Sequence, residues 1–137
     1  GCSDLSVLRL DAALTGDADA EVNRVDVETG PFGMALSPDG ALVAVASRES
    51  MTRPIEGGTV SLIDVARAAA GRDDAEVARV PVGGTDETDR SRPFGVSFSQ
   101  DGALLVVSCF RTNVISVLAM PVSSAAPRVD LAAAVSG

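Results

Sequence analysis

Histidine, tryptophan, tyrosine and lysine are all absent from this chain of 137 residues. Without histidine, the chain cannot build a Ser-His-Asp triad or a histidine-ligated zinc site from its own residues. Every basic residue is an arginine, and the formal net charge is −8 with a pI near 4.3. The chain lacks the basic surface that a nucleic-acid backbone requires, so we expect no nucleic-acid partner. Attachment to anionic membrane surfaces is disfavoured for the same reason.

Long apolar runs are missing as well, and aromatic residues are few. No stretch approaches membrane-spanning length, and none has the pattern of a signal peptide. Hydrophobic residues make up 46% and charged residues 22% of the chain, which is ordinary for a globular protein. Because only four phenylalanines are present, we expect an aliphatic core.

What the chain does contain is an internal repeat. Residues 5–8, 60–63 and 115–118 each place a serine second among apolar residues, and these stretches lie 55 residues apart. Residues 22–27 and 77–82 share this spacing. Residues typical of β-strands that recur at such a period indicate propeller blades or solenoid repeats.

The middle of each unit repeats with a spacing of 62 residues. Pro-Phe-Gly occurs at 31–33 and 93–95, and Ser-x-Asp-Gly-Ala-Leu at 37–42 and 99–104. An Asp-Gly pair between apolar runs is a strong hairpin signal. A short helix is expected at residues 65–72, ended by Gly71. The expected strands are 33–37, 42–47, 59–65 and 77–82 in one unit, and 94–98, 103–109, 113–119 and 127–132 in the next.

The sequence thus predicts an all-β fold of β-propeller blades, each a four-stranded antiparallel meander, in an incomplete propeller or arc. Residues 1–27 would supply the last two strands of one blade, 28–82 a complete blade and 83–137 a second complete blade. Two and a half blades cannot close a ring. We therefore expect either the remaining blades of a parent chain or self-association to cover the exposed faces.

The repeated unit resembles the YVTN-type β-propeller repeat. The resemblance rests on Pro-Phe-Gly, on Ser-Pro-Asp-Gly, on residues 63–65 (Ile-Asp-Val) and on the closing residues 80–83. It implies a ring of about seven blades in the parent protein. It also implies a periplasmic, cell-surface or secreted location in a bacterium. Because these motifs shape strands and turns, they indicate the fold and carry no chemistry of their own.

Cys2 and Cys109 are the two cysteines of the chain. About two repeat units separate them, which argues against a disulfide, and two lone thiols make no metal site. Gly1-Cys2 matches the end of a lipoprotein cleavage box. The repeat places Cys2 in a hairpin loop, however, so we do not favour lipid anchoring. We expect Cys109 to be buried.

The meander topology predicts that the candidate ligand site lies at one edge of the blades. Connections after the second and fourth strands emerge at the same edge, and the long insertions 48–58 and 83–92 are such connections. Insertions in repeat proteins collect on the binding face. Arginines there could bind a carboxylate or phosphate, although local ion pairs on the surface are the interpretation that we favour. The candidate ligand-binding residues are Arg48, Arg53, Glu56, Arg92, Arg111 and Asn113.

A metal site at the same edge is a weaker hypothesis. Asp86, Glu87 and Asp89 could offer oxygen ligands to Ca²⁺, but their spacing matches no complete calcium loop. A solvated acidic turn balanced by Arg90 and Arg92 is the interpretation we favour. We therefore expect no cofactor.

Three functions are compatible with these features. We favour a non-catalytic, extracytoplasmic scaffold that binds a protein or carbohydrate partner through the loops of one face. The alternative is part of a lactonase-like propeller hydrolase acting on sugar lactones, with acid–base residues at the channel mouth supplied by other blades. A redox propeller with a central cofactor is the third, and no haem-attachment motif supports it.

Overall fold

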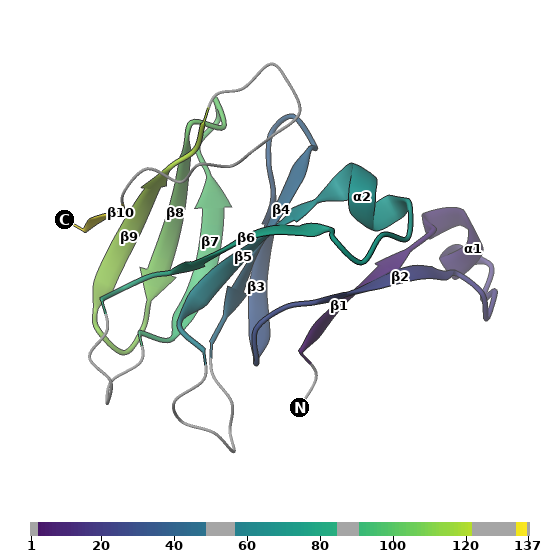
Figure 1. Cartoon of the computed structure of the whole chain (residues 1–137), viewed down its shortest axis with the longest axis horizontal. Helices are drawn as coiled ribbons and strands as arrows, with labels where there is room; N and C mark the ends of the chain where they lie inside the picture. Colours follow the sequence, from purple (N-terminus) through teal and green to yellow (C-terminus); the bar gives the residue numbers. More distant parts are fainter. Residues whose placement is uncertain (1–2, 49–56, 85–90, 122–133, 137) are drawn as a thin grey trace.

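The structure, a computed structural model, describes residues 3–48, 57–84, 91–121 and 134–136. Strands dominate these residues and form three antiparallel sheets (Figure 1). The smallest sheet holds two strands, β1 (Asp4–Leu8) and β2 (Glu21–Asp26), which are joined through the short helix α1 (Leu10–Leu14). Neither helix of the described part is long and apolar enough to cross a membrane.

The central sheet is a four-stranded meander in the order β3-β4-β5-β6. Its strands lie within two residues of the positions that the repeat predicts. They are β3 (Pro31–Leu36), β4 (Leu42–Ser47), β5 (Thr59–Asp64) and β6 (Glu76–Pro81). The Asp-Gly turn between β3 and β4 forms as expected, with Gly40 at a φ of +73°.

The third sheet repeats this meander in the order β7-β8-β9-β10. Its strands are β7 (Pro93–Phe98), β8 (Leu104–Cys109), β9 (Val114–Ala119) and β10 (Ala134–Ser136). The position of the fourth strand differs from the expectation of 127–132, which lies outside the described residues. The strand that pairs with β9 is formed by the later residues Ala134–Ser136.

Two four-stranded meanders and a two-stranded sheet, placed side by side, are the blades of an incomplete propeller-like arc. The all-β fold class predicted from the repeat is therefore correct. The exact unit boundaries at residues 27 and 82 stay a prediction.

A short helix precedes the last strand of two successive units. The expected one is α2 (Val65–Ala69), and the Asp64 carboxylate caps it by accepting a hydrogen bond from the Arg67 amide at 2.8 Å. The helix α1 was not expected, although it occupies the same place one repeat earlier. Asn23 on β2 ties the two units together, because its side-chain amide donates to the carbonyls of Ala68 and Arg72 at 3.1 and 3.0 Å.

The core lies between the sheets and is aliphatic, as expected. One cluster joins the central and third sheets: Ala44, Val60, Leu62, Val82, Leu105, Val107, Cys109, Leu118 and Met120. A second cluster joins the β1–β2 sheet to the central one: Val25, Val27, Val45, Ile63, Ala68 and Ala75. Blade-on-blade packing is thus the main source of apolar burial.

The inner strands of the two complete meanders, β3 and β7, come very close together. A Cβ atom built on Gly33 would lie 2.2 Å from the carbonyl oxygen of Phe94. Glycine is therefore the one residue that allows this approach. The contact places the side chains that follow Pro31 and Pro93 next to each other.

Candidate functional site at the loop edge

The described ends of both long insertions lie at one edge of the sheets, which we call the loop edge. The amide of Gly58 donates to Ser47 at 2.9 Å, and that of Val82 donates to Gly58 at 3.0 Å. The amide of Gly83 donates to the Ser116 hydroxyl at 2.8 Å. The first two bonds lie within the central meander, and the bond from Gly83 links that meander to β9 of the third sheet.

An aromatic–arginine cluster, formed by Phe32, Arg48 and Phe94, marks the inner end of the loop edge. The rings of Phe32 and Phe94 are stacked with centroids 4.4 Å apart and an interplanar angle of 36°. The guanidinium carbon of Arg48 lies 5.8 Å from the Phe32 ring centroid, a cation–π distance. Both rings remain exposed, and Arg48 is half-buried. An exposed aromatic pair beside a cation is a surface suited to binding.

A cavity of about 510 Å³ adjoins this cluster and shares Phe94 with it. Its walls are mostly apolar, and Asn113 supplies an amide. The lining residues are Phe94, Ser108, Cys109, Phe110, Asn113, Val114 and Ile115. A mostly apolar hollow with a few polar groups is the usual form of a small-molecule site.

Arg92 and Arg111 stand on two backbone segments that are hydrogen-bonded to each other. The Phe110 amide donates to the Arg92 carbonyl at 3.0 Å, and the Arg111 amide donates to Ser91 at 3.2 Å. Arg92 and Asn113 have φ values of +50° and +54°, in the left-handed region. Asparagine adopts this region readily, so Asn113 also shapes the turn before β9, as expected.

The other candidate residues from the sequence lie outside the described residues. Arg53 and Glu56 belong to the first insertion, and the proposed calcium ligands Asp86, Glu87 and Asp89 belong to the second. Within the part of the chain that the structure describes, no three carboxylate, cysteine or histidine side chains group as metal ligands do.

Cys109 is buried, as the sequence predicts, with 2% of its surface exposed. Burial raises the pKa of its thiol, and the nearby Ser116 hydroxyl partly offsets that rise. The thiol is therefore protonated at neutral pH and acts as a packing group rather than as a nucleophile.

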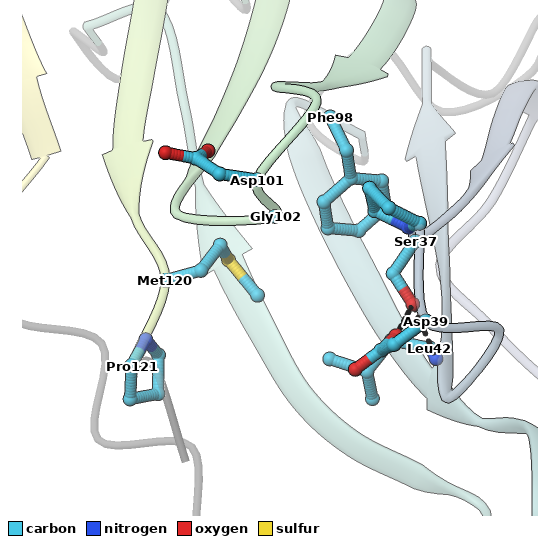
Figure 2. A pocket seen from close by; sticks show the side chains of 9 residues that line it. Ser37, Asp39, Leu42, Phe98, Asp101, Gly102, Met120 and Pro121 are labelled. Atoms are coloured by element: carbon cyan, nitrogen blue, oxygen red, sulfur yellow. Dashed lines mark hydrogen bonds between the residues drawn. The ribbon is translucent and has the colours of Figure 1, made fainter. Parts of the chain in front are cut away.

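The opposite edge of the sheets, which we call the turn edge, has a smaller cavity of about 340 Å³ (Figure 2). It lies between the Asp-Gly turns of the two meanders, and Phe98 and Met120 also line it. The Asp39 carboxylate accepts hydrogen bonds from the Ser37 hydroxyl at 2.6 Å and the Ala41 amide at 3.0 Å. Figure 2 shows the carboxylate of Asp101 directed away from Ser37. Asp39 and Asp101 thus shape their own turns and do not converge on a ligand.

The turn-edge geometry predicts a pH effect. Hydrogen bonds from Ser37 and then Ala41 lower the pKa of Asp39 below its ordinary value of 3.8. A lowered pKa stabilises the folded chain above the ordinary value, and this stabilisation fades as the pH falls through the folded pKa. In Ser37→Ala, the carboxyl resonance of Asp39 in an NMR titration should move at a higher pH. Ser99→Ala, the equivalent change beside Asp101, should leave the titration of Asp39 unchanged.

Sequence reasoning identified Arg48 and Asn113 at the loop edge but missed the aromatic surface. Phe32 and Phe94 entered the analysis as parts of a strand motif, and Phe110 was not considered. One signal in the sequence could have revealed this surface. A Phe-Gly pair recurs at equivalent positions of the two units, and the phenylalanine is exposed to solvent in both.

Comparison with known proteins supports the fold and leaves the function open. No family model and no curated protein matches the sequence. Among solved structures, the chain is similar to a protein of Bacteroides fragilis NCTC 9343 that is provisionally described as a 6-phosphogluconolactonase. The TM-score is 0.62 at 19% identity, over 94% of this chain and 32% of that one. The chain thus spans about a third of the length of that neighbour, and the likeness concerns the fold alone.

Proposed function

We propose that the chain is part of a YVTN-type propeller that binds a sugar-like, negatively charged ligand at the loop edge and does not itself carry the catalytic groups. The observation that carries the proposal is the aromatic–arginine cluster beside the cavity at Phe94. Its chemistry is that of binding, because aromatic faces, a guanidinium and an amide are brought together there.

Each part of the cluster has a role in such a complex. The rings of Phe32 and Phe94 offer apolar faces against which the C–H face of a sugar ring loses its contact with water. The guanidinium of Arg48 lies over the Phe32 ring, with its central carbon 5.8 Å from the ring centroid, and its terminal N–H groups can donate to a carboxylate or phosphate. Asn113 adds an amide that can pair with hydroxyl groups.

A titration of the isotope-labelled chain with gluconate tests this proposal. We expect saturable NMR shifts at Phe32, Arg48, Phe94 and Asn113. Arg48→Ala should weaken binding by about tenfold or more, because a charge-assisted hydrogen bond contributes about 1.5–3 kcal/mol.

Two controls accompany the titration. Arg67→Ala, on α2 and away from the loop edge, should leave the gluconate Kd unchanged. Glucose, which has no carboxylate, should bind more weakly than gluconate. A gluconate Kd that Arg48→Ala does not alter, or the lack of saturable shifts at millimolar ligand, would contradict the proposal.

Hydrolysis of a sugar lactone is the second candidate, and the structural neighbour is the observation that favours it. In that case, the loop edge would hold the lactone while groups from other blades activate water. Adding glucono-1,5-lactone to the parent chain, which contains those other blades, distinguishes the two. A scaffold leaves the spontaneous opening rate unchanged, whereas a hydrolase accelerates it, and Arg48→Ala removes the acceleration.

The extracytoplasmic location and a protein or carbohydrate partner belong to the same proposal. The location is supported by the resemblance of the repeat to YVTN-type blades, and the partner by the long insertions at the loop edge. Calcium binding at Asp86, Glu87 and Asp89 is not part of the proposal, because those residues lie outside the described part of the chain.

A further inference from the structure

The β1–β2 sheet is the outer half of a blade, and its geometry repeats that of β5–β6. Leu5 pairs with Val25 as Val60 pairs with Val80, and both pairs of strands shift register at the equivalent place, after Val7 and after Leu62. An ion pair repeats as well. Arg24 contacts Glu21 at 2.8 Å, and Arg79 contacts Glu76 at the same distance.

One edge of β1 nevertheless has no strand beside it among the described residues. Its equivalents are paired on both sides: β5 lies between β4 and β6, and β9 lies between β8 and β10. β1 pairs with β2 alone, in a two-stranded ribbon that packs beside the central sheet (Figure 1). The open edge therefore carries backbone groups of the kind that take up an added strand.

A second surface lies open next to this edge, on β3. Met34 and Leu36 are 66% and 59% exposed. Their equivalents on the third sheet, Val96 and Phe98, are partly buried against the core. This difference in exposure arises because β3 and β4 pack against β7 and cover Val96 and Phe98. No described strands pack against β3 in the same way, so Met34 and Leu36 stay uncovered.

We propose that the open edge of β1, together with Met34 and Leu36, is a docking surface for a two-stranded β-hairpin of the kind formed by β7 and β8. The interface between the central and third sheets supplies the template. The second strand of the hairpin pairs with β1, as β8 pairs with β9. Its first strand then lies over Met34 and Leu36, as β3 lies against β7.

The template also fixes the register of the added strand. In the third sheet, Ser108 is opposite Ile115 and Val106 is opposite Val117. Leu5 and Val7 are the equivalents of Ile115 and Val117, so they should face the same two hairpin positions. Asp4 corresponds to Val114, so a hairpin copied from residues 93–113 joins β1 directly ahead of Asp4.

A graft tests the proposal: a second copy of residues 93–113, with Cys109→Ser in the copy, is fused ahead of Asp4 in place of residues 1–3. We expect the thermal midpoint to rise by about 5 °C or more over the original chain. Amide exchange should slow along β1. An extension of the same composition in scrambled order is the matched control and should raise the midpoint little.

The double change Met34→Glu and Leu36→Glu separates docking from a general effect of the extension. Both side chains are exposed in the original chain, so its midpoint should change little. In the grafted chain, the same change should remove most of the gain. A gain that survives it, or a gain equal to that of the scrambled extension, would overturn the proposal.

Sedimentation of the original chain tests whether a second copy of the chain occupies this surface instead of a hairpin. If the original chain forms a dimer that Met34→Glu and Leu36→Glu dissociate, the surface belongs to a second copy, and the hairpin proposal is wrong. A monomer at all concentrations, together with a gain from the graft that depends on Met34 and Leu36, supports it. Neither result depends on gluconate binding at the loop edge.

Discussion

Replacing Gly33 with alanine is expected to disrupt the contact between the central and third sheets. The added methyl group would lie 2.2 Å from the Phe94 carbonyl oxygen, a distance that real Cβ atoms do not tolerate. The obstacle is backbone, so a rotamer change cannot relieve it, and β3 must move away from β7. We expect a loss of about 3 kcal/mol in the free energy of unfolding. Far-UV circular dichroism in a denaturant series measures it.

Gly95→Ala is the matched control, because Gly95 holds the equivalent position one repeat later. A Cβ atom there would lie 3.1 Å from the Ser108 hydroxyl, which is the end of a side chain and can shift. We expect a loss of no more than about 1 kcal/mol. Equal losses at Gly33 and Gly95 would mean that the close approach of β3 and β7 does not hold.

Gly83→Ala is expected to have the second large effect. Gly83 has a φ of +80°, and a Cβ atom there would lie 2.4 Å from Ser91 Cβ and 2.6 Å from Cys109 Sγ. Alanine therefore meets both backbone strain and a buried contact. We expect the unfolding free energy to fall by about 3–4 kcal/mol. The change should also disturb the bond from the Gly83 amide to Ser116.

Gly84→Ala separates these two causes. Gly84 has a similar φ of +73°, but no atom lies within 4 Å of its Cβ position. The loss should then reflect backbone strain alone, about 1 kcal/mol. Thermal unfolding of the two variants side by side gives the comparison. A Gly84 variant as unstable as the Gly83 variant would contradict the packing of Gly83 against Cys109.

The repeat in the sequence was sufficient to predict most of the strands. Spacings of 55 and 62 residues placed β3 to β9 within about two residues, because blades of one kind share their strand lengths and turns. The expected fourth strand of the last unit, 127–132, lies outside the described residues. Only a short valine-containing stretch supported that position, whereas pairing with β9 uses Ala134–Ser136. The five-residue helix α1 carries too little periodicity to be recognised from sequence.

The candidate site was predictable in position but not in chemistry. The meander rule placed Arg48 and Asn113 at one edge, because it depends on strand order alone. The stacking of Phe32 on Phe94 depends on how closely two sheets approach, and that distance is set by the missing side chain of Gly33. The strand motif describes one unit at a time, so it does not reveal that Phe32 of one unit contacts Phe94 of the next.

The most direct test of this account is the contact between the rings of Phe32 and Phe94, whose centroids lie 4.4 Å apart. The chain has four phenylalanines and no other aromatic residue, so single Phe→Leu variants suffice to assign the ring signals. We expect nuclear Overhauser effects between the ring protons of Phe32 and those of Phe94. If the Phe32 ring shows contacts only within its own sheet, the two inner strands do not meet, and the proposed binding site is not formed.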